Sequence, residues 1–228
     1  TSVATVLQSR SETAFTLKAL STVPGNLVTA IASETDDNTE YLARQAIAML
    51  AAGQDASVQI KTLLQRQNDD GGFGGAPMYA SNPLDTAWAL IALNASGQTT
   101  TVPGALGYLQ AVQQPDGSFG LDGHADIYTS AYVLSALHLY ASVFPMSTVI
   151  QSTTNYLMVA QSVSGNWAKS PWITALVYQA VHDFVPLDPT ASAVKSYLVS
   201  SQLADGSWGD DPYVTAVILR TLQQTGSV

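Results

Sequence analysis

Three carboxylic acids fall within four residues near the start of the chain, at Glu34, Asp36 and Asp37. Neighbouring carboxyl groups shift one another's pKa, and a carboxyl tuned in this way can act as a general acid. The same residues stand directly before a helical pattern that begins near Tyr41, and acidic residues also cap and stabilise the N-terminus of a helix. The segment therefore predicts either an acid site or a helix start.

Aromatic and charged side chains in apolar helical segments form a second set of candidates. Aromatic rings offer an apolar surface whose π faces attract cations, although they also fill ordinary cores. Charged side chains are less expected in such segments, because burying a charge is costly. They either bind an anionic group or extend to the rim of the helical layer. Glu40 and Arg44 are four residues apart, a spacing that predicts an ion pair on one helix. The predicted ligand-binding residues are Trp88, Tyr128, Tyr132, Trp172, Tyr213, Glu40, Arg44 and Arg220.

The sequence contains no cysteine, which excludes disulfides, thiolate metal sites and a cysteine nucleophile. An acidic loop around Asp122, His124 and Asp126 lacks the full ligand set of a calcium loop. We therefore expect no metal and no cofactor. Asp126 is expected to cap the helix that follows it, and Asp85 and Asp211 to do the same in their own segments.

A four-fold repeat positions these candidates along the chain. Each copy reads Gln, two variable residues, a turn of Asp-Gly type and then an aromatic residue, and the copies begin 41 to 48 residues apart. Asp and Gly favour a tight turn, because the Asp side chain bonds the local backbone and Gly tolerates positive φ. The copies start at Gln67, Gln113, Gln161 and Gln202.

The segments around each motif predict helices of two kinds. An amphipathic pattern precedes the motif and a uniformly apolar pattern follows it, so the first helix faces water and the second is buried. The repeat unit of about 45 residues is thus an outer helix, a tight turn and an inner helix. Inner helices are predicted at 13–20, 41–52, 85–93, 128–137, 172–178 and 213–219, and outer helices near 2–9, 24–33, 55–67, 103–113, 147–161 and 190–203.

Twelve helices in two concentric layers predict an all-α (α/α)6 toroid. Nothing in the pattern resembles a linker, so we expect a single toroid domain over residues 1–228, which a longer protein could contain.

Charged residues make up 11% of the chain and the net charge is −9 without a basic cluster, which argues against nucleic acid as a partner. No apolar run reaches the roughly 18–20 residues of a transmembrane segment. Ser, Thr, Gln and Asn are plentiful among the polar residues, and this composition favours an extracytoplasmic, secreted protein.

The Gln-x-x-Asp-Gly-Ser-Trp/Phe-Gly pattern resembles the QW-type repeat of the prenyltransferase and squalene/terpenoid cyclase superfamily, over essentially residues 38–225. Protein prenyltransferases and thioester domains of this kind need a cysteine, which this chain lacks. Class II cyclases instead protonate an alkene or epoxide with the central acid of an Asp-x-Asp-Asp motif at the start of an inner helix. The resemblance implies Glu34 as the first acid, Asp36 as the proton donor and Asp37 as the next carboxylate.

Two features depart from that pattern: the first acid is Glu, and Asn38-Thr39 replaces the family's usual Thr-Ala. Class II cyclases also place the active site between two helical barrels, whereas this chain is long enough for one. We therefore favour a non-catalytic toroid that binds an apolar or isoprenoid molecule, a protein partner or a further domain. The first alternative is a class II isoprenoid cyclase with Asp36 as general acid. The second is a polysaccharide-active (α/α)6 enzyme with paired carboxylates.

Overall fold

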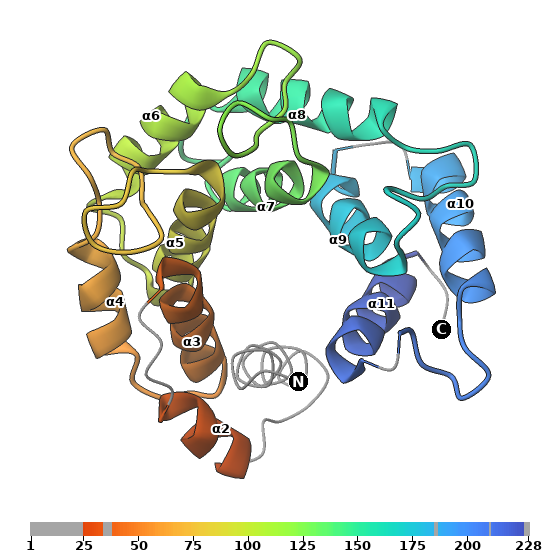
Figure 1. Ribbon diagram of the computed structural model, residues 1–228, viewed down its shortest axis with the longest axis horizontal. Helices are drawn as coiled ribbons and strands as arrows, with labels where there is room; N and C mark the ends of the chain where they lie inside the picture. The colour runs from red at the N-terminus through yellow and green to blue at the C-terminus, as the bar shows by residue number, and fades with distance from the viewer. Residues whose placement is uncertain (1–24, 34–37, 185–186, 210, 226–228) are drawn as a thin grey trace. The chain divides into compact units, whose positions relative to one another are not determined.

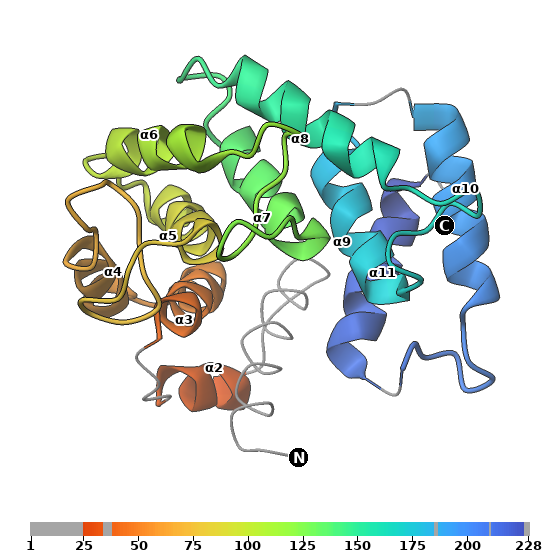
Figure 2. The ribbon, with the colours of Figure 1, turned by 45° about the horizontal axis from the view of Figure 1, so that its top comes forward.

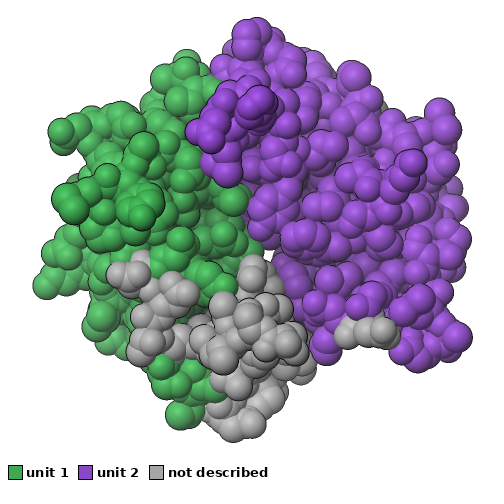
Figure 3. All heavy atoms as spheres, viewed as in Figure 1, with its two compact units in different colours: residues 1–112 green, residues 113–228 purple. Residues whose placement is uncertain are grey.

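The computed structural model describes residues 25–33, 38–184, 187–209 and 211–225. The chain divides into two compact units, residues 1–112 and 113–228 (Figure 3). The described residues form ten α-helices and two isolated β-bridges. The helices are α2 (Gly25–Ala32), α3 (Thr39–Ala51), α4 (Ser57–Leu64), α5 (Pro83–Ser96), α6 (Val102–Val112), α7 (Ile127–His138), α8 (Ser147–Val159), α9 (Pro171–Val181), α10 (Leu187–Ser200) and α11 (Pro212–Gln224).

In the first unit the predicted inner helices α3 and α5 pack against each other (Figure 1). Helices α2 and α4 lie against α3, and α6 lies against α5 (Figure 2). Most residues of α3 and α5 are buried, as expected of inner helices. The predicted alternation of outer and inner helices is therefore confirmed within this unit.

The second unit repeats the same order. Helix α9 packs between α7 and α11, while α8 lies against α7 and α10 lies against α9 (Figures 1 and 2). Each helix of the two units overlaps the segment that the sequence predicts for it. The predicted helices at 2–9 and 13–20 lie outside the described residues.

The repeated turns are closed by side chains of the motif itself. The carboxylates of Asp70, Asp116 and Asp205 each accept the backbone N–H two residues further on, at 2.9–3.0 Å. The Gln side chain closes the turn from its other end by donating to the carbonyl of the turn glycine. This bond recurs at 2.8–3.2 Å from Gln67 to Gly71, Gln113 to Gly117, Gln161 to Gly165 and Gln202 to Gly206.

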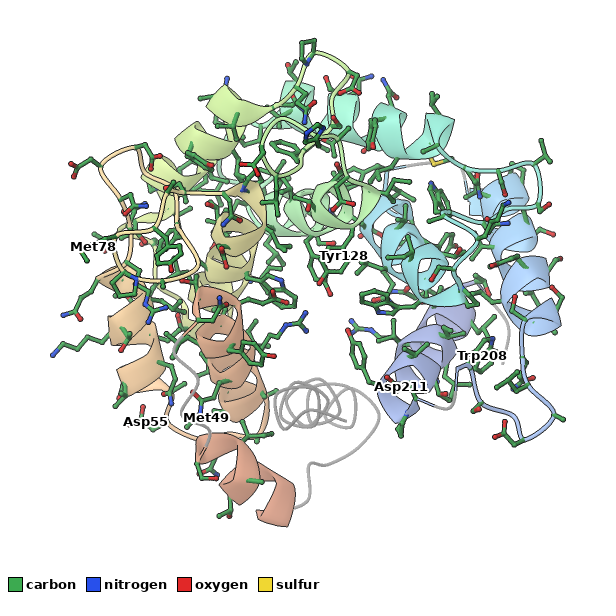
Figure 4. The ribbon with its side chains drawn as sticks, in the orientation of Figure 1. Met49, Asp55, Met78, Tyr128, Trp208 and Asp211 are labelled. Carbon is green, nitrogen blue, oxygen red and sulfur yellow. The ribbon has the colours of Figure 1, made fainter. Side chains whose placement is uncertain are left out.

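The aromatic residue of each motif is buried and is hydrogen-bonded to the inner helix that follows it. Its backbone N–H donates to a Thr or Ser hydroxyl in the first turns of that inner helix, at 2.9–3.1 Å. In the last copy the indole Nε1–H of Trp208 also donates to the carbonyl of Leu198 in α10, at 2.8 Å (Figure 4). The four pairs are Phe73 with Thr86, Phe119 with Ser130, Trp167 with Thr174 and Trp208 with Thr215.

Candidate functional site

The N-terminus of α3 is fixed by its cap and by the loop that precedes α5. Asn38 is the N-cap, and its side-chain oxygen accepts the backbone N–H of Glu40 at 2.9 Å. Thr39 donates its backbone N–H to the carbonyl of Gly75 at 2.9 Å and its hydroxyl to the carbonyl of Gly74 at 2.5 Å. The first turn of this inner helix is therefore held in place from two sides.

The predicted acids Glu34, Asp36 and Asp37 lie outside the described residues. The next residue in the chain is the cap Asn38, so the acid segment ends directly before α3 begins. The expectation that the acids precede an inner helix is thus confirmed for their place in the sequence. Their role as a proton-donating group stays a prediction.

Glu40, Arg44 and Trp88 form one cluster between α3 and α5, in which Arg44 and Trp88 are buried. The Arg44 guanidinium donates to Oε1 of Glu40 through Nε at 2.9 Å and Nη2 at 2.6 Å. Its central carbon lies 3.9 Å from the ring centroid of Trp88, which is a cation–π contact. The Arg44 side chain is only 4% exposed. The predicted ion pair is confirmed, and the structure adds the aromatic partner.

The prediction that Asp85 caps an inner helix is wrong. The N-cap of α5 is Asn82, whose side-chain oxygen accepts the Asp85 N–H at 2.9 Å, so the expectation that Asp85 caps this helix is wrong. Pro83 explains the shift, because proline favours the first helical position and leaves the residue before it as the cap. The Asn82-Pro83 pair was the signal that could have shown this.

The Asp85 carboxyl is instead buried in the first turn of α5. The Asn82 side-chain amide donates to its Oδ2. Burial raises the pKa of Asp85, and the negative charge of Glu40 raises it further, while the hydrogen bond from Asn82 and the charge of Arg66 oppose the shift. Two carboxyl groups of unlike environment, Glu40 and Asp85, therefore lie near the N-terminal ends of adjacent inner helices.

The other two predicted caps are confirmed. Asp126 is the N-cap of α7 and accepts the Thr129 N–H at 2.8 Å. Asp211 is the N-cap of α11 and accepts from the N–H groups of Tyr213 at 2.8 Å and Val214 at 3.3 Å (Figure 4). These two carboxylates therefore cap helices of the second unit.

Three of the predicted ligand-binding aromatics form a cluster in the second unit. The ring centroid of Tyr128 lies 4.8 Å from that of Tyr132 and 5.4 Å from that of Trp172. Figure 4 shows Tyr128 on the side of α7 that faces away from α8. The Trp172 Nε1–H is buried and has no hydrogen-bond acceptor among the described residues. The cluster thus combines an apolar aromatic surface with one unused donor.

The two remaining candidates, Tyr213 and Arg220, lie on α11. Tyr213 is in its first turn and Arg220 is about two turns further along. Both side chains are partly exposed. Their assignment to ligand binding stays a prediction.

The imidazoles of His138 and His182 both contact the carboxylate of Asp183, at 3.2 Å and 2.9 Å. No group of three or more His, Asp or Glu side chains in residues 25–33, 38–184, 187–209 and 211–225 is placed to hold a metal ion. Within the same ranges, every helix is too short or too polar to cross a membrane.

Comparison with known families gives one match along most of the chain. Residues 7–217 match the model of the prenyltransferase alpha-alpha toroid domain. Over a 70-residue stretch the chain is 41% identical to the drimenyl diphosphate synthase of Streptantibioticus cattleyicolor. That stretch is 30% of this chain and 13% of the relative.

Solved structures of terpene cyclases share the fold. The ent-copalyl diphosphate synthase from Streptomyces platensis matches with a TM-score of 0.76 at 17% identity, over 97% of this chain and 51% of its own. A variant of the type II terpene cyclase MstE from Scytonema, in complex with geranylgeranyl dihydroxybenzoate, matches with a TM-score of 0.62 at 16% identity, over 96% of this chain and 62% of its own. The chain thus spans about half the length of the first of these proteins. The predicted all-α toroid is confirmed.

Proposed function

The chain belongs to the prenyltransferase alpha-alpha toroid domain family, and from this premise we propose that it is the acid-bearing toroid of a class II terpene cyclase. In this proposal Asp36 protonates a carbon–carbon double bond of an isoprenoid substrate, and Asp37 and Glu34 tune its acidity. The observation that carries the proposal is the 41% identity over 70 residues with a drimenyl diphosphate synthase. The structural likeness to class II cyclases agrees with it but, at 16–17% identity, supports only the fold.

The position of the acid segment supports this role. Alkenes are weak bases, so protonation needs an acid whose conjugate base is stabilised. The segment ends directly before the N-terminus of α3, where the helix dipole stabilises negative charge. A carboxylate formed there by proton transfer is therefore favoured over one in the middle of a helix.

The aromatic residues support the second half of the reaction. Protonation breaks the O–H bond of the acid, forms a C–H bond and leaves a carbocation, which π faces stabilise. Trp88 already holds a cation on its ring, since the Arg44 guanidinium lies 3.9 Å from its centroid. In the second unit, Tyr128, Tyr132 and Trp172 offer further ring surface. These rings suit an apolar substrate whose positive charge moves during cyclisation.

A second candidate function is an apolar-ligand-binding module without catalysis. The charge compensation at α3 favours it, because Arg44 places two donors on Glu40 and thereby neutralises the carboxylate nearest to the acid segment. Glu34 and Asn38 also depart from the family's acid motif. This module would retain the aromatic surface and lose the proton transfer.

A product assay with a matched control separates the two candidates. The full chain is incubated with C15 and C20 prenyl diphosphates and with squalene, and extracts are analysed by GC-MS. Asp36→Asn removes the proposed proton, whereas Asp69→Asn makes the same chemical change at an exposed residue. If the chain is a cyclase that uses Asp36, the wild type and Asp69→Asn form a cyclised product and Asp36→Asn does not.

Ligand binding is measured on the same proteins by tryptophan fluorescence. Binding without any product overturns the cyclase proposal and leaves the binding module. Equal product from the wild type and Asp36→Asn keeps the cyclase but overturns the role of Asp36. If none of the substrates binds, both candidate functions are wrong for these molecules.

A further inference from the structure

The turn that leads into α9 has a strained backbone, and the proposed reaction gives this turn no role. Ala168 and Lys169 both have φ of +54°, in the left-handed region. This region is unfavourable for residues other than glycine, because the β-carbon comes too close to the following carbonyl oxygen. The last copy of the repeat has Gly209 at the position of Ala168, with φ of +70°. The third copy therefore places two L-residues in a backbone conformation that favours glycine.

Hydrogen bonds on both sides hold this turn in place. The backbone N–H of Trp167 donates to the hydroxyl of Thr174 in α9 at 3.0 Å. The side-chain oxygen of Asn166 accepts the Lys169 N–H at 3.1 Å. The N–H of Ser170, the N-cap of α9, donates to the Trp167 carbonyl at 3.1 Å. Strained backbone persists only where its surroundings fix it in this way, so the path of the chain into α9 is well defined.

The Trp172 ring lacks the hydrogen bond that ties two other tryptophans to the fold. The indoles of Trp167 and Trp208 donate through Nε1–H to backbone carbonyls, at 2.5 and 2.8 Å. The Trp172 Nε1–H has no acceptor among the described residues. Trp172 is the second residue of α9, and its ring centroid lies 5.4 Å from that of Tyr128. Packing and the backbone that enters α9 therefore set the position of this ring.

We propose that the Ala168-Lys169 turn is a positioning element, which holds the Trp172 ring against Tyr128 and thereby determines how an isoprenoid chain lies on the aromatic cluster. The contact with the isoprenoid rests on the proposed function. Aromatic contacts are directional, so their strength depends on where the ring lies. Two L-residues have fewer accessible conformations than glycine, and this turn therefore restricts the start of α9 more tightly than a glycine turn would.

Substitution by glycine separates positioning from a merely structural role. Ala168→Gly leaves the donors and acceptors of the turn in place and relieves its strain. The urea midpoint of this variant is expected to stay the same or rise, because relief of strain offsets the greater freedom of glycine in the unfolded chain. The matched control is Met78→Gly in the loop before α5 (Figure 4). Met78 has φ of +66° and is 98% exposed, and its loop contributes no residue to the aromatic cluster.

The ring position can be observed by NMR without a ligand. In protein labelled with ¹⁵N each tryptophan indole gives one N–H signal, and Trp172→Phe assigns the signal of Trp172. Ala168→Gly is expected to shift or broaden the Trp172 signal, because the ring then samples more positions, and to leave the Trp208 signal unchanged. Met78→Gly is expected to leave both signals unchanged.

The effect on the ligand is measured with C15 and C20 prenyl diphosphates. An aromatic contact of this kind changes an affinity by about two- to ten-fold. Ala168→Gly is therefore expected to raise the Kd, measured by tryptophan fluorescence, by this factor and to change the ratio of the cyclised products. Met78→Gly is expected to keep the Kd and the product ratio of the wild type.

Three outcomes would overturn the proposal. A lower urea midpoint in Ala168→Gly means that the turn holds no strain that glycine relieves. An unchanged Trp172 signal means that the turn does not position the ring. A changed signal with an unchanged Kd and product ratio removes the role in ligand binding. If the wild type binds neither diphosphate, the ligand role of the turn fails together with the proposed function, while the NMR comparison alone still decides whether the turn positions Trp172.

Discussion

The turn glycines offer a test of how each repeat packs on the next one. Gly117 and Gly206 occupy the same motif position, with φ of +88° and +87°. A β-carbon on Gly117 would lie 2.3 Å from the backbone carbonyl oxygen of Ser152 in α8, whereas on Gly206 the nearest atom among the described residues is the side-chain nitrogen of Gln202 at 3.9 Å. Substitution by Ala therefore imposes the same backbone strain at both sites, but within the described part of the chain it makes a clash with backbone at only one.

The expected costs follow from these two effects. An L-residue in the left-handed region costs about 1–2 kcal/mol, so Gly206→Ala should destabilise the protein by that amount. Gly117→Ala should cost a further ~1–3 kcal/mol, because the α8 backbone must move to accept the methyl group. Its total is thus about 2–5 kcal/mol on these two grounds.

Urea unfolding followed by far-UV circular dichroism measures both variants against the wild type. We expect the larger loss in the free energy of unfolding for Gly117→Ala. Equal losses in the two variants would refute the close approach of this turn to α8. The backbone strain would then be the whole effect.

Two further predictions concern single side chains. Trp208→Phe keeps an aromatic ring of the kind found at Phe119 but leaves the Leu198 carbonyl without the indole donor. Urea unfolding should therefore show a loss of about 1–3 kcal/mol in the free energy of unfolding. A loss within error of zero would contradict a stabilising role of this bond. Because the pKa of Asp85 is raised in the folded state, the folded protein binds more protons than the unfolded chain, and stability should fall as pH rises from about 4 through the folded pKa. Asp85→Asn should remove this part of the pH dependence, and an unchanged difference between the two proteins from pH 4 to 8 would contradict the shift.

The helices and turns were predictable because each repeat carries its own local signals. The motif from Gln113 to Phe119 contains a turn closed by its own residues. The Asp116 side chain bonds the local backbone as predicted, and the structure adds the bond from the Gln113 side chain to the Gly117 carbonyl. A uniformly apolar stretch as long as 128–137 predicts a buried helix, because buried strands are usually shorter. Four copies of one pattern then fixed the alternation of outer and inner helices.

The candidate site was predictable in part, because only some of its contacts are local in sequence. The Glu40–Arg44 ion pair follows from their spacing of four on one helix. The cation–π contact of Arg44 with Trp88 joins two helices, and no local pattern specifies which ring meets which charge. The same limit applies to Asp85, whose pKa is raised by burial and, to a smaller extent, by the negative charge of Glu40 on another helix.

The central claim is that this toroid starts cyclisation by protonation, and isotope incorporation tests it most directly. The full chain is incubated with a C15 prenyl diphosphate in deuterium oxide, and the product is analysed by mass spectrometry without removal of the diphosphate. Since the acid exchanges its proton with solvent, we predict a cyclised product that keeps its diphosphate and carries one solvent-derived deuterium. A cyclised product without deuterium, a product that has lost its diphosphate, or recovery of unchanged substrate alone would contradict it.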